Sequence, residues 1–75
     1  MTEQSQELPV PFDVVALLAA LPAERLVVGQ VGTVVETLDE RTVLVEFADN
    51  QGRAYAMVPC QRFKLLVLHH KPQTT

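Results

Sequence analysis

Apolar and polar residues alternate most clearly in the middle of the chain, at Val43, Leu44, Val45, Glu46 and Phe47. Successive side chains of a β-strand point to opposite faces, so Val43, Val45 and Phe47 share one face. Three large apolar side chains on one face predict a strand that packs this face against a core. We therefore expect Phe47 to be buried.

Short polar segments flank this strand on both sides. Residues 39–41 read Asp-Glu-Arg, and residues 49–52 read Asp-Asn-Gln-Gly. Both are typical of hairpin loops, and Gly52 occupies a position that favours positive φ. They predict two tight hairpins that join the central strand to neighbouring strands over residues 33–38 and 53–58.

Residues 13–21, DVVALLAAL, fit two kinds of secondary structure. Alanine and leucine favour an amphipathic helix with Asp13 as its N-cap. The alternating positions also fit a strand, although both alternating sets are apolar. Pro22 ends either element, and the strands that follow favour the strand interpretation.

The remaining segments complete an all-β pattern. Residues 22–29 predict a wide loop, and Gly29 with Gly32 indicates a tight backbone corner with positive φ at one or both glycines. Residues 59–63 predict a single 3-10 turn, and residues 64–68 predict a closing strand. Five short strands joined in this order are expected to form an SH3-like barrel, which closes on itself and so protects its edges.

Length and composition predict one small domain. Of the 75 residues, 1–11 are expected to form a flexible tail, 12–68 the barrel and 69–75 a frayed end. Cys60 is the only cysteine, and the N-terminus lacks a basic start and an apolar run, as expected of a cytoplasmic protein. The longest apolar run has 8 residues, far below the ~20 that span a bilayer, so no membrane association is expected. The net charge of −3 disfavours nucleic acid as a partner.

Five motifs carry a resemblance to a known family: DVVALL, LP, GQVGTVVE, VEFAD and GRAYA. Together they resemble a family of small bacterial proteins known only as a domain of unknown function. The resemblance covers residues 13–68, favours a strand over residues 13–21 and implies no activity. VVGQVGTVVE is more distantly similar to the glycine-centred, KOW-type motif of ribosomal and transcription-factor barrels that contact RNA. Those motifs carry more lysine and arginine, whereas Arg25 is the only base nearby here.

Candidate catalytic and metal-binding residues are few. Gly29 and Gly32 are expected to be turn glycines, because a phosphate-binding loop opens a helix and a β-branched strand follows here. Cys60, His69 and His70 are too few for a structural zinc site, which takes four ligands. Nothing in the sequence orients either histidine as a base for the cysteine. We expect no cofactor, no metal and no enzymatic activity.

Three residues are candidates for contact with a ligand or partner: Arg25, Arg53 and Tyr55. Arginine and tyrosine are common hot spots of binding. They support an alternative function, in which the corner at Gly29–Gly32 and the loop over residues 22–28 bind a small ligand or nucleic acid. The acidic residues are expected to be solvated, with Glu46 paired to Arg53 across the second hairpin.

The first and last strands carry apolar residues on both faces, although a small barrel has only one interior. The surplus is expected to form one outward-facing patch, because these strands are adjacent in such barrels: Val14, Leu18, Leu44, Leu66 and Leu68. Monomers seldom leave a large apolar patch in water, unless a bulge or a tail covers it. The leading prediction is a non-enzymatic interaction module that forms a homo-oligomer or docks on a partner protein.

Overall fold

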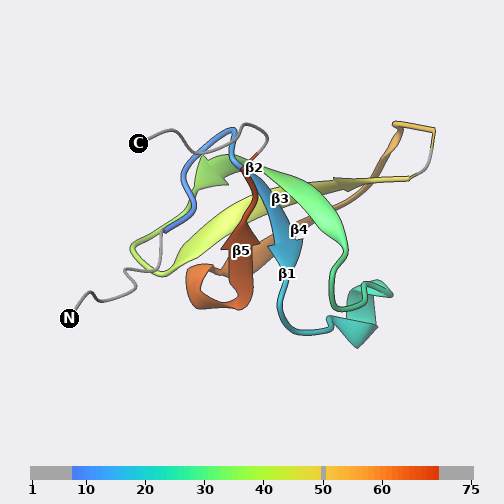
Figure 1. Ribbon diagram of the computed structural model, residues 1–75, viewed down its shortest axis with the longest axis horizontal. Coiled ribbons are helices and arrows are strands. Elements are labelled where there is room, and N and C mark those ends of the chain that lie inside the picture. Colours follow the sequence, from blue (N-terminus) through green and yellow to red (C-terminus); the bar gives the residue numbers. More distant parts are fainter. Residues whose placement is uncertain (1–7, 50, 70–75) are drawn as a thin grey trace.

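The computed structural model describes residues 8–49 and 51–69, which form one antiparallel β-sheet (Figure 1). The sheet has five strands in the order β4-β3-β2-β1-β5. Two short 3-10 turns, η1 (Pro22–Glu24) and η2 (Arg62–Lys64), precede β2 and β5. The strands are β1 (Val14–Leu17), β2 (Val31–Thr37), β3 (Thr42–Ala48), β4 (Ala54–Gln61) and β5 (Leu65–Val67).

The strand order confirms the all-β fold predicted from the sequence. The first and last strands pair with each other, with Val15 opposite Val67 and Leu17 opposite Leu65. β4 and β5 are the two edges of the sheet, and η2 joins them. The backbone N–H of Arg62 in η2 donates to the carbonyl of Arg41, 2.8 Å away, which attaches this turn to the first hairpin. Five antiparallel strands with a 3-10 turn before the last agree with a small barrel.

The inner face of the sheet holds the hydrophobic core. Alternation places one set of side chains from each strand on this face, and β3 contributes Val43, Val45 and Phe47, each with no exposed surface. Phe47 is therefore buried, as its position in the pattern predicts. The buried cluster gathers residues from every strand and one from the first loop: Val15, Leu17, Leu26, Val34, Val43, Val45, Phe47, Val58, Cys60 and Leu65.

Gly29 and Gly32 differ in what the fold requires of them. Gly29 has φ +90°, and a Cβ there would have no heavy atom within 4 Å. Gly32 lies inside β2 in register with Phe47, and a Cβ there would come within 2.8 Å of the Phe47 and Val45 side chains. Gly29 therefore supplies the turn, whereas Gly32 allows two layers of the core to approach closely.

The first strand is shorter than the sequence predicts. Residues 13–21 contain no helix, but β1 ends at Leu17 and a bend follows at Leu18 and Ala19. Beyond Leu17 the chain leaves the sheet and returns through a bridge between Leu21 and Leu26. Leu26 is 1% exposed, so the first loop contributes a core residue and has a defined path. Strand pairing, and not local alternation, determines where β1 ends.

The fourth strand is longer than the sequence predicts. It continues through Pro59 to Gln61, so the 3-10 turn begins at Arg62 and not at Pro59. Proline lacks an N–H donor and fits a strand only where that donor is not needed. Because β4 is an edge strand, Pro59 lies opposite Leu44 without interrupting a central ladder.

Residues just before β1 are also packed. Pro9 is buried, and the turn that follows is held by the carboxylate of Asp13, which accepts from the Val10 N–H at 3.0 Å. Phe12 has φ +76° in this turn and a largely exposed side chain. Of the tails expected over residues 1–11 and 69–75, the parts at 1–7 and 70–75 lie outside the described residues.

Candidate functional site

The outer face of β5, β1 and β2 carries a row of apolar side chains. Ala16 of β1 pairs with Leu66 of β5 on one side and with Val31 of β2 on the other. Register partners project from the same face of an antiparallel sheet, so these three side chains lie in one line. With their neighbours along the strands they form what we call the outer apolar face: Val14, Ala16, Leu18, Val31, Leu66 and Leu68.

Three large side chains of the outer apolar face remain half in solvent. Leu18, Leu66 and Val31 are 47%, 48% and 50% exposed. Val14 and Leu68 are partly covered, and Ala16 is buried between its larger neighbours. Two charged residues lie at the border of this face: the carbonyl of Lys64 accepts from the Leu18 N–H, and Glu46 is in register with Thr33, the partner of Val14. The face is thus an apolar centre with a charged rim, the usual arrangement of a protein interface.

Four of the five predicted interface residues lie on this face: Val14, Leu18, Leu66 and Leu68. Leu44 does not join them, because β3 and β1 are separated by β2. On β3, Leu44 is in register with Glu36 and Pro59. The sequence did not indicate Val31 or Ala16 as members of this face. Both assignments follow from Gly32, which lies on the inner face: Val31 is next to it and therefore faces outward, and Ala16, the register partner of Val31, does the same.

A shallow depression of about 240 Å³ lies where the long first loop meets the second hairpin. Two of the three predicted contact residues, Arg25 and Tyr55, line it. Its other lining residues are Gln30, which belongs to the predicted Gly29–Gly32 corner, and Ala48 and Asp49, which the sequence did not indicate as contacts. The register shift at Phe47 and Ala48 places a bulge in this hairpin, beside Tyr55.

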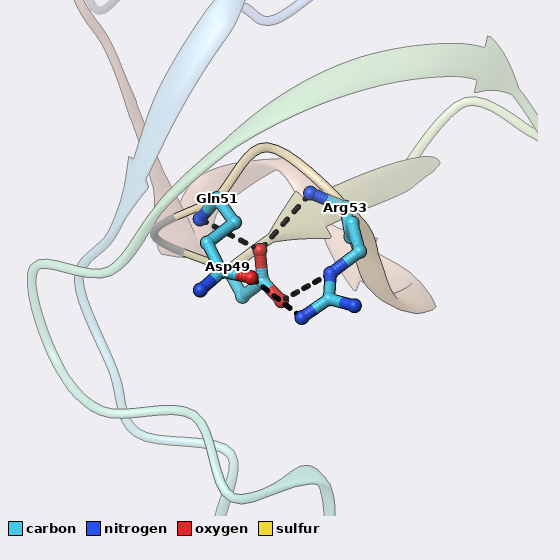
Figure 2. Close-up of polar contacts among 3 residues, drawn as sticks. All are labelled: Asp49, Gln51 and Arg53. Atoms are coloured by element: carbon cyan, nitrogen blue, oxygen red, sulfur yellow. Dashed lines mark hydrogen bonds and ion pairs between the residues drawn. The ribbon is translucent and has the colours of Figure 1, made fainter.

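Arg53, the third predicted contact residue, is engaged within its own hairpin (Figure 2). Its Nε lies 3.5 Å from Asp49 Oδ2, and its Nη2 donates to Gln51 Oε1 at 2.6 Å. Asp49 Oδ1 accepts from the backbone N–H groups of Gln51 and Arg53, at 2.9 and 3.0 Å. The predicted pairing of Arg53 with Glu46 is wrong, because Glu46 lies opposite Met57, further along the hairpin.

Cys60 lies on the inner face and lines a small cavity of about 230 Å³. Its thiol is 3.5 Å from the carbonyl of Val58, to which it donates. Burial raises the pKa of the Cys60 thiol above its ordinary 9.0, so the thiol stays protonated at neutral pH and is a poor nucleophile. Residues 8–49 and 51–69 contain no cluster of three or more metal-ligating side chains. The described helical segments are single 3-10 turns, none with the length and apolar character needed to cross a bilayer.

These features define a small all-β domain that has an apolar exterior face and a polar depression between its first loop and its second hairpin. The chain belongs to the family DUF4926, a domain of unknown function, whose pattern matches residues 11–67. This confirms the expected membership in a family without an assigned activity. Comparison with curated proteins and with solved structures gave no match.

Proposed function

We propose that this domain is a non-enzymatic interaction module that self-associates through the outer apolar face. The observation that carries the proposal is the row of Leu66, Ala16 and Val31 across three adjacent strands, with large side chains half exposed along it. Contiguous apolar surface of this kind is seldom left in water by a monomer. Burying one Leu or Val side chain is worth about 1.5–3 kcal/mol, so several from each chain offset an association cost of several kcal/mol.

A second copy of the chain is the occupant that the sequence favours. Residues 1–7 and 70–75 read MTEQSQE and HKPQTT, and apart from Met1 they offer no large aliphatic side chain to cover the face. The outer apolar face of a second copy, by contrast, offers apolar side chains that could cover those of the first. A two-fold arrangement brings the same surface of both chains together, so each covers the other.

The test is the oligomeric state of two matched glutamate variants. Leu66 lies on the outer apolar face, whereas Leu38 lies after β2 and is similarly exposed, at 44%. The wild-type chain and Leu38→Glu should both sediment as dimers or larger forms at micromolar concentration. Leu66→Glu should sediment as a monomer, because a carboxylate buried in the interface would lose its hydration.

Circular dichroism should show that both variants retain the β-sheet. A wild-type chain that sediments as a monomer at the highest attainable concentration would contradict the proposal. Equal loss of association in Leu66→Glu and Leu38→Glu would also contradict it, because the effect would then not belong to the outer apolar face.

A further inference from the structure

The depression between the first loop and the second hairpin is built from residues far apart in the sequence. Arg25 follows η1, Gln30 precedes β2, and Asp49 and Tyr55 flank the second hairpin loop. The hollow has a volume of about 240 Å³, enough for a single amino-acid side chain or a small organic acid. It lies at the end of the sheet and shares no residue with the outer apolar face.

The carboxylate of Asp49, the acidic group of the depression, already has hydrogen-bond and ion-pair partners within the hairpin. Both carboxylate oxygens of Asp49 are used within the hairpin, one by two backbone N–H groups and the other by the guanidinium of Arg53. The negative charge of Asp49 is therefore offset by Arg53 before any ligand arrives. Arg25, Asp49 and Arg53 together leave one positive charge beside the hollow.

The other polar groups of the depression have donors that no described residue engages. Within the described part of the chain, neither the Arg25 guanidinium nor the Tyr55 hydroxyl makes a side-chain hydrogen bond or ion pair. The amide oxygen of Gln30 accepts from the Val27 N–H at 3.4 Å, which leaves its NH₂ group available. The groups available to a ligand are thus a guanidinium, a hydroxyl and an amide NH₂, and each can donate a hydrogen bond.

We infer that this depression binds a carboxylate group. A guanidinium donates two parallel hydrogen bonds to a carboxylate, and a tyrosine hydroxyl and an amide NH₂ add single donors. The backbone at Arg25 has a defined conformation: it has φ 60° and ψ 36° at the end of η1, and its N–H donates to the Pro22 carbonyl at 3.0 Å. The carboxylate belongs either to a small free acid or to an acidic side chain of a peptide.

Two carboxylate probes distinguish these sources in a ¹H–¹⁵N NMR titration of the whole chain. One is sodium glutarate, and the other is an acetylated, amidated peptide of alternating glycine and glutamate. Saturable shifts of the amides around Arg25, Gln30 and Tyr55 are expected with the source that the site accepts. The probe that saturates at the lower concentration identifies that source.

Two arginine variants with the same change in net charge make the test specific. Arg25→Gln should weaken binding of the preferred probe about tenfold, the loss of one charge-assisted hydrogen-bonding group. Arg41→Gln, at the tip of the other hairpin, should leave binding unchanged. Tyr55→Phe should weaken binding about fivefold through the loss of one hydrogen bond.

Three outcomes would overturn the inference. They are no saturable shift with either carboxylate probe, equal saturation by inorganic phosphate, and equal weakening by Arg25→Gln and Arg41→Gln. None of these depends on the oligomeric state, so the inference and the proposed self-association fail or hold separately.

Discussion

Around β1 and β5, neighbouring side chains of the same kind lie in different surroundings on the two faces of the sheet. Val15 and Leu17 point inward and are 0% and 2% exposed, whereas the adjacent Leu18 is half exposed. On β5, Leu65 is buried and Leu66 is half exposed. Leu17 and Leu65 therefore belong to the hydrophobic core, whereas their neighbours Leu18 and Leu66 lie on the outer face, where the described residues form no second core.

The central strand shows what a one-sided strand looks like in the same sheet. On β3 the inner face holds Val43, Val45 and Phe47, and the outer face includes Glu46, which water can solvate. A strand that is apolar on both faces is normally covered on both. The proposed self-association would supply the layer that β1 and β5 lack on their outer face, and β3 does not need such a layer at Glu46.

The test with the largest expected effect truncates two neighbouring leucines, Leu17 at the end of β1 and Leu18 directly after it. Leu17→Ala should lower the free energy of unfolding by about 2–5 kcal/mol, because it leaves a cavity in the core. Leu18→Ala should change it by no more than about 0.5 kcal/mol in the isolated chain. Urea denaturation at a concentration below self-association measures both values, because association adds its own stability.

The same two variants should act in reverse order on self-association. At high concentration, Leu18→Ala should sediment as a smaller species than the wild-type chain, because it removes apolar area from the outer face. A large loss of stability in isolated Leu18→Ala would instead place Leu18 in the core of its own chain, and the contrast between the faces would fail.

A second test adds one methyl group to the inner face at Gly32. A Cβ at Gly32 would lie 2.8 Å from Phe47 Cδ1 and 2.9 Å from the carbonyl oxygen of Glu46, which is backbone and cannot rotate away. Gly32→Ala should therefore cost about 1–3 kcal/mol through overpacking. Thermal unfolding followed by circular dichroism measures the loss.

Gly29 provides the matched control, because it lies outside the core and has open space around it. Gly29→Ala should cost about 1 kcal/mol through its positive φ alone. Asparagine tolerates positive φ better than alanine, so Gly29→Asn should recover part of that loss. Gly32→Asn should recover none of the stability lost in Gly32→Ala. If it did, the inner face would have room for a side chain beside Phe47.

Alternation and turn chemistry predicted most of the fold. The β3 pattern, the two polar loops and the proline after residues 13–21 were sufficient for five strands in order. The strand ends were not predictable in the same way. β1 ends at Leu17 because its partners are short segments of β2 and β5, and β4 passes through Pro59 because it lies at an edge. Both depend on pairing, which no local pattern contains.

The candidate sites were predicted in part for the same reason. Val14, Leu18, Leu66 and Leu68 were identifiable because the first and last strands of such a fold are neighbours. The position of Leu44 and Val31 depends on register. Gln30 and Asp49 join Arg25 and Tyr55 only through the way the first loop packs against the second hairpin. Sequence patterns thus identify the apolar and polar residues that the core does not need, whereas the register and loop packing determine which of them lie together.

The smallest expected effect lies at the hairpin tip between β2 and β3, which belongs to neither face. Asp39 Oδ1 accepts from the Arg41 N–H at 2.8 Å, and this hydrogen bond holds the pKa of the Asp39 carboxyl below its ordinary 3.8. A lowered folded-state pKa stabilises the fold above the unfolded-state pKa, and this stabilisation is lost as the pH falls through the folded-state pKa. Asp39→Asn should therefore be slightly less stable than the wild-type chain at neutral pH, and the difference should vanish in acid.

Urea denaturation at a series of pH values measures this difference. Glu40→Gln is the matched control, because it removes the same charge from the same loop, and among residues 8–49 and 51–69 the Glu40 side chain makes no such hydrogen bond. If Glu40→Gln changed the pH dependence as much as Asp39→Asn, the effect would come from net charge and not from the turn. In either case the contrast between Leu17→Ala and Leu18→Ala should persist at every pH where the chain is folded, because it depends on apolar burial and not on a carboxylate at the tip.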